Sequence, residues 1–326
     1  MGKEKEDLRI VYMGTPEFAV ESLRALVENG YHVVGVVTMP DKPVGRHMSE
    51  LQASPVKKYA LSQAIPVLQP EKLKDEIFLT DLRDLKADLQ IVVAFRMLPE
   101  VVWNMPRLGT FNLHASLLPQ YRGAAPINWA VINGEKETGV TTFFLTHEID
   151  TGKIILQKRV SVSDTDTAGE IHDRLMTTGA GLVLETVDLI LSAKIDAISQ
   201  ESLYVSPSEL RPAPKIFKET CRIDWTLPAR DIHNFVRGLS PYPAAWTHLI
   251  SMDGSSQVLK IYRTTYTVMS HSLSVGTLRL SGKNSLDVAT KDGFVHLHTV
   301  QIAGKKQMSV ADFLNGFKEI ETMYLG

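Results

Sequence analysis

The pattern of apolar and polar positions predicts strands and helices in alternation along the first part of the chain. Short apolar runs predict buried strands, and apolar residues spaced three and four apart predict helices with one buried face. The expected strands cover 8–13, 31–38, 89–95, 109–114, 139–145 and 153–162. The expected helices cover 18–27, 55–63, 124–133 and 168–193.

This alternation indicates an α/β fold built on a mostly parallel, doubly wound sheet with helices on its faces. Residues 39–53 interrupt the pattern with Pro40, Pro43 and Gly45 and predict a loop. Functional sites in open parallel sheets lie at the carboxyl ends of strands. Polar residues that directly follow a strand are therefore the first candidates for a site.

The pattern changes from about Ser199 onward. Prolines at 207, 212 and 214 predict a linker, a helix is expected near 228–239, and short alternating strands with turn residues fill 244–301. We therefore expect a catalytic domain over 1–200, a linker over 201–214 and a smaller OB-like β-barrel domain over 215–326.

Composition narrows the class of protein. No apolar run reaches the roughly 18 residues of a transmembrane helix, and the first nine residues lack the order of a secretory signal. The single cysteine, Cys221, permits no intrachain disulfide. We expect a cytoplasmic protein with no membrane contact.

Charge is unevenly distributed. The net charge is -2, but residues 211–326 carry 14 Lys/Arg against 9 Asp/Glu, whereas residues 1–210 carry 21 against 28. A basic back half fits a partner that presents phosphates. Chance asymmetry remains the alternative at this point.

The first candidate site is the pair Asn112 and His114. The two residues are two apart near the end of an expected strand, so their side chains point to the same face. An amide and an imidazole can both donate hydrogen bonds to one oxygen, which is what acyl transfer needs as an oxyanion develops. The alternative is a structural Asn and a His satisfied within a turn.

The second candidate is Asp150, which follows another expected strand in the run His147-Glu148-Ile149-Asp150-Thr151-Gly152. Its carboxylate could accept a proton from an attacking amine, although the same residues could form a simple turn. The spacing of His147 and Glu148 does not fit H-E-x-x-H, so no metal is expected. No G-x-G-x-x-G follows the first strand, and no G-x-S-x-G is present.

These two segments together resemble the signature of the N10-formyltetrahydrofolate-dependent formyltransferases. The resemblance rests on Asn112-x-His114-x-Ser116-Leu117-Leu118-Pro119-x-Tyr121-Arg122-Gly123 and on the Asp150 segment. It implies that Asn112 and His114 bind the formyl oxygen, and that Asp150 orients His114 and helps to remove the amine proton. It also implies 10-formyltetrahydrofolate as co-substrate.

The resemblance places the folate against two segments. One is Ser116, Leu117, Leu118 and Pro119, and the other contains Phe95, Met97 and Leu98. The family often has a Tyr-Gly pair near this second segment. This chain has Arg96 there, so we expect an altered wall beside the folate.

Further segments are similar to the branch of the family that formylates the methionine on initiator tRNA. They are Met13 to Phe18, Pro40 to Arg46, Arg222 to Trp225 and Ala303 to Ser309. The resemblance implies initiator methionyl-tRNA as partner and tRNA contacts through Lys42, Arg46, Lys305 and Lys306. No obligate protein partner is inferred from the sequence.

Three other interpretations remain open. The same three polar residues would serve an enzyme that formylates an amino sugar nucleotide or a glycinamide. They would also serve a hydrolase that releases formate from the folate. From a different class, the chain could be a tRNA-binding module with a vestigial pocket.

Overall fold

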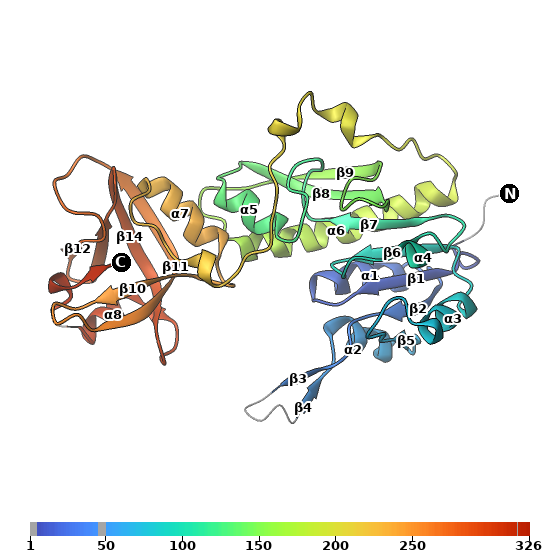
Figure 1. The fold of residues 1–326 in the computed structure, drawn as a ribbon, viewed down its shortest axis with the longest axis horizontal. Coiled ribbons are helices and arrows are strands. Elements are labelled where there is room, and N and C mark those ends of the chain that lie inside the picture. The colour runs from blue at the N-terminus through green and yellow to red at the C-terminus, as the bar shows by residue number, and fades with distance from the viewer. Residues whose placement is uncertain (1–4, 45–49, 318) are drawn as a thin grey trace. The chain divides into compact units, whose positions relative to one another are not determined.

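The computed structural model describes residues 5–44, 50–317 and 319–326 (Figure 1). The chain forms two compact units. The first unit contains Met1–Gly123, Thr138–Val160 and His172–Pro212, and the second contains Ala124–Glu137, Ser161–Ile171 and Ala213–Gly326. The assignment of 201–214 as a linker remains a prediction.

The first unit is built on a seven-stranded sheet in the order β5-β2-β1-β6-β7-β8-β9. Its strands are β1 (Ile10–Gly14), β2 (Val33–Val37), β5 (Val67–Leu68), β6 (Leu89–Val93), β7 (Thr110–His114), β8 (Glu137–Phe144) and β9 (Ile154–Ser161). The pairs from β5 to β7 are parallel, and β8 pairs antiparallel with β7. The expected mostly parallel sheet is confirmed.

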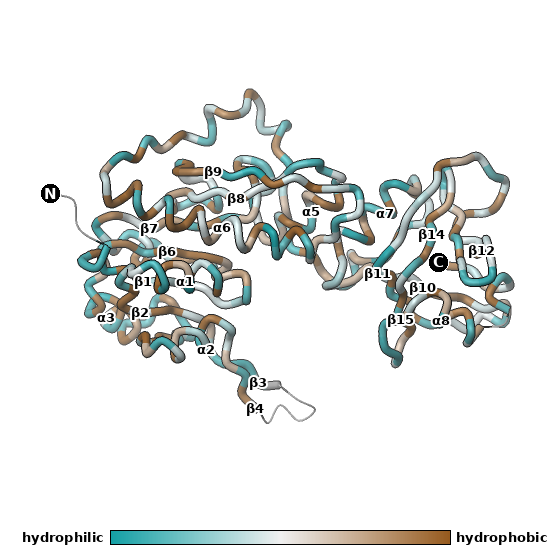
Figure 2. Tube along the Cα trace, turned by 180° about the vertical axis from the view of Figure 1, so that it is seen from behind, coloured by the Kyte–Doolittle hydropathy of each residue, from teal (hydrophilic) through white to brown (hydrophobic). Residues whose placement is uncertain are grey.

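Helices cover both faces of this sheet. They are α1 (Phe18–Glu28), α2 (Pro55–Ser62), α3 (Glu76–Asp84), α4 (Glu100–Trp103) and α6 (Ala168–Leu191). The helices α3 and α4 pack on the face that carries Val11 and Val92. The helix α1 lies on the opposite face, where the Tyr12 hydroxyl donates to the Ala19 carbonyl at 2.6 Å. Figure 2 shows the apolar character of the central strands between these layers.

The strand register decides where the candidate residues point. Asn112 is paired with Val92, and Leu113 with Val93. Paired residues of parallel strands point to the same face, so Asn112 and His114 lie on the α3/α4 face. Leu113 points to the other face, where a side chain at Gly179 of α6 would lie within 2.7 Å of it. Both polar residues therefore stand together at the carboxyl end of β7.

The prediction of a loop over 39–53 is wrong in part. The structure has two short antiparallel strands here, β3 (Lys42–Val44) and β4 (Glu50–Gln52). Pro43 indicates a loop when read alone, but proline is tolerated in an edge strand whose N–H faces solvent. The short elements β5, α3 and α4 also have no counterpart among the expected strands and helices.

The second unit contains a curled antiparallel sheet in the order β12-β13-β14-β11-β10-β16, with β15 beside β14. Its strands are β10 (Ala245–Ile250), β11 (Ser256–Val268), β12 (Leu278–Gly282), β13 (Ser285–Ala289), β14 (Gly293–Ile302), β15 (Met308–Ser309) and β16 (Tyr324–Leu325). The edges meet where Thr277 bridges Tyr324. This curled sheet confirms the expected β-rich second domain.

The described part of this unit also contains five short helical elements. They are α5 (Pro126–Ile132), η3 (Glu219–Cys221), α7 (Ala229–Gly238) and α8 (Val310–Asn315), followed by η4 (Ile320–Thr322). Buried residues of α7, such as Ile232 and Val236, share one apolar core with Leu259, Val295 and Val300 of the sheet.

A buried carboxylate organises one face of this curled sheet. Asp287 is 1% exposed and accepts hydrogen bonds from Arg279 at 2.7 Å, His296 Nδ1 at 2.6 Å and Ser281 at 3.0 Å. Burial disfavours the charged carboxylate, but the three hydrogen bonds together outweigh it. They hold the pKa of Asp287 below its usual range.

The Asp287→Asn variant should be less stable than the wild type at pH 7, by about 3 kcal/mol, because Arg279 and His296 lose a buried carboxylate. A lowered folded-state pKa gives stability that is present above the unfolded-state pKa and lost as pH falls through the folded-state pKa. The difference between variant and wild type should therefore shrink below about pH 4.

Urea unfolding at pH 7, 5 and 3, followed by tryptophan fluorescence, measures this difference. The exposed Asp231→Asn variant in α7 is the control and should change by less than about 1 kcal/mol. An Asp287→Asn effect that is equally large at pH 3 would contradict the argument.

Candidate active site

The imidazole of His114 is buried at the end of β7, with 6% exposure. Its Nε2 lies 2.8 Å from the carbonyl oxygen of Tyr121. A carbonyl can only accept, so Nε2 carries the hydrogen in this bond. The other ring nitrogen, Nδ1, lies 3.9 Å from Asp150 Oδ2. This distance suits an ion pair but is too long for a hydrogen bond. The backbone of Tyr121 therefore holds the ring, and Nδ1 faces the carboxylate.

The amide of Asn112 has no hydrogen bond within the described residues. Its Oδ1 is buried without a partner. An unpaired buried polar atom costs about 1 to 3 kcal/mol, so such atoms in folded proteins call for an explanation. The residue is placed on the same strand face as His114, two positions earlier. An amide held without a protein partner beside an imidazole suits a polar ligand.

The carboxylate of Asp150 is held by a backbone group rather than by another side chain. Its Oδ2 accepts from the N–H of Gly123 at 3.0 Å. The residue has φ +55°, a left-handed conformation that is uncommon outside glycine. Tyr121 has φ +61°, and Ala94, directly after β6, has φ +47°. Such conformations cluster at functional sites, and here they surround the ends of β6, β7 and β8.

The turn that carries Asp150 has little room to move. A side chain at Gly152 would place its Cβ 1.6 Å from the carbonyl oxygen of Phe144. The N–H of Phe144 in turn donates to the carbonyl of Lys153 at 3.0 Å. The turn is thus packed directly against the end of β8.

The segment predicted to contact the folate follows His114 immediately. Ser116 and Leu118 are buried, with 0% and 2% exposure. The Ser116 hydroxyl donates to the Gln120 carbonyl at 2.7 Å, and the Leu118 N–H donates to Thr141 at 3.2 Å. Leu117 and Pro119 lie in the same tightly bonded loop. The segment is therefore held by burial and hydrogen bonds, and its contact with a folate stays a prediction.

The three residues of the second predicted folate segment differ in their surroundings. Phe95 and Leu98 pack into the cluster on the α3/α4 face, and Leu145 joins this cluster to the one around Leu118. Met97, by contrast, is 74% exposed. The structure thus connects two of these three residues to the segment after His114 through apolar packing.

Arg96 forms its hydrogen bonds with residues outside this cluster. Its guanidinium donates to the backbone carbonyls of Pro70 and of Glu71, the latter at 2.7 Å, and lies over the Phe95 ring. Burial lowers the pKa of this guanidinium. The side chain ties the segment after β6 to residues 70–71, which gives this unexpected arginine a structural role.

The residues predicted to bind tRNA lie on both units. Lys42 is exposed on β3, and Arg46 lies outside the described residues. Lys305 and Lys306 are exposed in the turn between β14 and β15. Nearby, Lys57 forms an ion pair with Asp41 at 2.6 Å, so its charge is offset locally.

Sequence reasoning missed how the site is held. The carbonyl of Tyr121 binds the His114 ring, the N–H of Gly123 binds the Asp150 carboxylate, and Gln200, far along the chain, contacts the Asp150 turn. Tyr121 and Gly123 belong to the motif and could have been singled out. Nothing near Gln200 in the sequence indicates its partners.

Within ranges 5–44, 50–317 and 319–326, no group of three or more His, Cys, Asp or Glu side chains could hold a metal ion. In the same part of the chain, no helix has the length and apolar character needed to cross a membrane.

Comparison with known families identifies the class of protein that this fold and site define. A family model described as "Formyl transferase" matches residues 8–187, and one described as "Formyl transferase, C-terminal domain" matches residues 215–318. The chain belongs to the formyl transferase family, as the two sequence segments indicated, and it is an enzyme.

Two relatives are similar over nearly their whole length. The methionyl-tRNA formyltransferase of Parabacteroides distasonis is 68% identical over 323 residues, which cover 99% of this chain and 100% of that protein. The methionyl-tRNA formyltransferase of Bacteroides thetaiotaomicron is 64% identical over 315 residues, 97% of each chain.

A solved structure shares the fold. The N-formyltransferase from Helicobacter canadensis, in complex with folinic acid and dTDP-3-aminofucose, superposes with a TM-score of 0.64 at 21% identity. The match covers 89% of this chain and 98% of that one.

Proposed function

We propose that this enzyme transfers a formyl group from 10-formyltetrahydrofolate to the α-amino group of methionyl initiator tRNA, for translation initiation in the cytoplasm. The relatives that support the acceptor are 60% to 68% identical and match almost end to end. The structural observation that supports the chemistry is that the Asn112 side chain, on the same strand face as His114, makes no hydrogen bond among the described residues, so its amide N–H groups are available to donate.

The reaction needs a hydrogen-bond donor that stabilises negative charge on the formyl oxygen. When the amine nitrogen attacks the formyl carbon, the formyl oxygen becomes negative and a bond forms between carbon and the amine. The bond from carbon to N10 of the folate then breaks, N10 takes up a proton, and the amine nitrogen loses one. We assign Asn112 as a hydrogen-bond donor to the developing oxyanion, through its amide nitrogen.

The held ring orientation limits what His114 can do. Its Nε2 hydrogen is committed to the Tyr121 carbonyl, so only Nδ1 remains for the reaction. A neutral ring would present Nδ1 as an acceptor, and a protonated ring would present it as a second donor to the oxyanion. The carboxylate oxygen Oδ2 of Asp150 lies 3.9 Å from this Nδ1.

Asp150 is the group we assign to proton removal from the amine. Its Oδ2 is bound by one backbone N–H, which leaves the other carboxylate oxygen without a partner in the described part of the chain. General-base catalysis by a positioned carboxylate contributes about 100- to 10,000-fold.

The donor would lie against the segment after His114. We assign Ser116, Leu117, Leu118 and Pro119 to this surface, with Phe95 and Leu98 on the apolar cluster that Leu145 joins to it. Met97, being exposed, would reach a ligand only at its edge. On this surface, apolar side chains would pack against the ring system of the folate, and backbone groups would bond to the polar edge of the rings.

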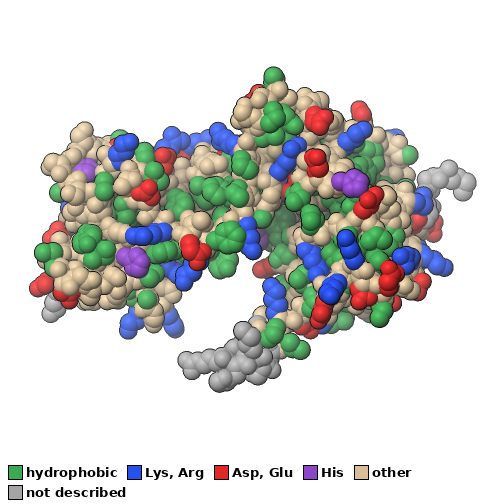
Figure 3. All heavy atoms as spheres, viewed as in Figure 1, with side chains coloured by type: hydrophobic (Ala, Val, Ile, Leu, Met, Phe, Trp, Pro, Cys, Tyr) green, Lys and Arg blue, Asp and Glu red, His purple; other side chains and the backbone are tan. Residues whose placement is uncertain are grey.

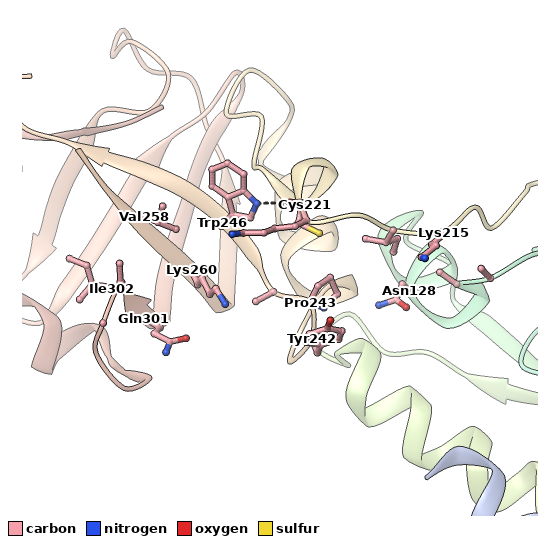
Figure 4. Close-up of a pocket in the computed structure, with 17 residues that line it drawn as sticks. Asn128, Lys215, Cys221, Tyr242, Pro243, Trp246, Val258, Lys260, Gln301 and Ile302 are labelled. Atoms are coloured by element: carbon pink, nitrogen blue, oxygen red, sulfur yellow. Dashed lines mark hydrogen bonds between the residues drawn. The ribbon is translucent and has the colours of Figure 1, made fainter. Parts of the chain in front are cut away.

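A pocket within the second unit supports an anionic partner such as tRNA. It has a volume of about 700 Å³, and its lining includes Lys215, Lys218 and Lys260 but no Asp or Glu. Trp246 lies among them, with its indole nitrogen donating to the Lys218 carbonyl at 2.7 Å (Figure 4). Ammonium groups without carboxylates attract phosphates, and an aromatic face suits a base.

Further basic side chains are exposed on this unit. Lys305 and Lys306 belong to the turn that begins beside this pocket, which is also lined by Gln301 and Gly304. Figure 3 shows Lys and Arg side chains on the visible surface of the unit. We propose that Lys305 and Lys306, together with Lys42 and Arg46, contact the phosphate backbone of the tRNA.

Asn112→Ala should lower kcat by about 100- to 1000-fold, the usual effect of removing one oxyanion donor. Folate and tRNA binding should change little, because the lost interaction forms mainly in the transition state. Single-turnover formyl transfer measures the effect. The matched control is Asn104→Ala, at the exposed end of α4, which should keep wild-type rates. Retention of over half the wild-type rate by Asn112→Ala would refute its assignment.

The acceptor is tested by offering labelled formyl-tetrahydrofolate with charged initiator tRNA, charged elongator methionine tRNA or an amino sugar nucleotide. We expect label on initiator tRNA alone. Label on the sugar, or formate released without an acceptor, would reject the proposed acceptor while leaving the chemistry of Asn112, His114 and Asp150 in place.

The Lys305→Ala/Lys306→Ala double variant should raise KM for tRNA and flatten its salt dependence, because each lost phosphate contact reduces the salt slope by about one. The maximal rate should persist, since the active site is untouched. Steady-state assays between 50 and 200 mM salt, roughly the range over which such contacts weaken, measure this. Lys283→Ala, a turn residue outside the pocket lining, is the control. An unchanged KM at every salt concentration would contradict these contacts.

A further inference from the structure

One buried side chain connects the two segments that hold His114 and Asp150. Gln200 is 1% exposed and lies in the short helix η1 (Gln200–Leu203) of the first unit. Its Nε2 donates to the carbonyls of Asp150 and Gly152, each at 2.8 Å. Its Oε1 accepts from Arg122 Nε at 3.0 Å and Nη2 at 2.7 Å. All the hydrogen-bonding capacity of this amide is therefore used.

The partners of Gln200 are next to the groups that hold the site. Arg122 lies between Tyr121, whose carbonyl accepts from His114, and Gly123, whose N–H donates to Asp150. Asp150 and Gly152 belong to the turn that carries the carboxylate. A single amide thus joins the loop after β7 to the turn after β8, and these loops set the 3.9 Å separation of imidazole and carboxylate.

The chemistry of these partners selects an amide. Two carbonyl oxygens require a donor, and a guanidinium requires an acceptor. A carboxylate would face the two carbonyls with negative charge, and a cationic side chain would face Arg122 with like charge. An apolar side chain would leave all the partners unsatisfied. Only a planar group with donors at one end and an acceptor at the other suits both sides.

The backbone beside Gln200 is held independently of its side chain. Ile198 exchanges two backbone hydrogen bonds, at 2.8 and 2.9 Å, with Ile154, the first residue of β9, and the two residues form a β-bridge. Replacement of the amide therefore leaves this segment anchored against the sheet. What changes is the connection to the Asp150 turn and to Arg122.

We propose that Gln200 is a positioning residue for formyl transfer: it holds the left-handed Asp150 turn and the Arg122 loop together, so that the Asp150 carboxylate faces His114. Asp150 has φ +55°, a conformation that costs about 1 kcal/mol or more and persists only where surrounding contacts maintain it. The bond from Gln200 to the Asp150 carbonyl acts on the strained residue itself.

The test is a double-mutant cycle between Gln200 and Asp150, with kcat and KM measured for both substrates. Gln200→Leu should lower kcat by about 10- to 100-fold, the size expected when a reacting group is displaced by about 1 Å. The KM values should stay within about threefold, because the folate segment 116–119 is held by its own hydrogen bonds to Gln120 and Thr141, and the residues assigned to tRNA lie outside the Asp150 turn. In an Asp150→Ala background, Gln200→Leu should change kcat by less than about twofold, since its effect passes through Asp150.

Two further variants separate positioning from general stability. Gln200→Glu keeps the shape and the acceptor for Arg122 but removes the donors to the turn, so it should lose activity like Gln200→Leu. Gln200→Glu therefore tests the positioning role if Gln200→Leu fails to fold. Ser202→Ala removes only a hydrogen bond within η1, from Ser202 to the Ser199 carbonyl, and should behave as wild type.

The outcomes distinguish this inference from the proposed function on which it rests. If Asp150→Ala alone keeps the wild-type rate, the role assigned to Asp150 fails. If Asp150→Ala is impaired but Gln200→Leu or Gln200→Glu lowers kcat by the same factor in both backgrounds, Asp150 stands and the positioning role is overturned. A wild-type rate in the folded Gln200 variants would overturn it as well.

Discussion

The hydrogen bond from His114 Nε2 to the carbonyl of Tyr121 folds the chain leaving β7 back over the end of its own strand. This bond determines which ring nitrogen is left for a reaction, and it brings the N–H of Gly123 to the Asp150 carboxylate. Because the loop is closed on both sides, each polar side chain is held by backbone groups. The site is therefore organised before any substrate binds, which is what stabilisation of a developing charge requires.

The cost of this arrangement is visible in the backbone. Tyr121 and Asp150 both adopt left-handed conformations at the site, and the amide of Asn112 has a buried oxygen without a partner. A stable fold avoids such features unless they are compensated, and here the compensation comes from the dense packing around β7 and β8. The bonds of Gln200 add to this support from a distant part of the chain.

The second unit accommodates charged side chains in two different ways. Its curled sheet surrounds an apolar core, while a pocket at its surface collects three lysines without any carboxylate. The lysines repel one another, and this repulsion is tolerable because water screens it until an anion binds. The buried Asp287 shows the opposite solution, in which a charge is removed from water and satisfied by three donors.

The sequence by itself determined the parallel sheet, the long helix α6, and the placement of Asn112, His114 and Asp150 at strand ends, because periodicity and strand order are local signals. It missed the β3–β4 pair, where Pro43 indicated a loop. Tertiary structure decided that Tyr121, rather than Asp150, accepts the hydrogen bond from His114, and that Gln200 contacts the Asp150 turn. These contacts depend on distances between segments far apart in the chain, and such distances exist only once the sheet has assembled.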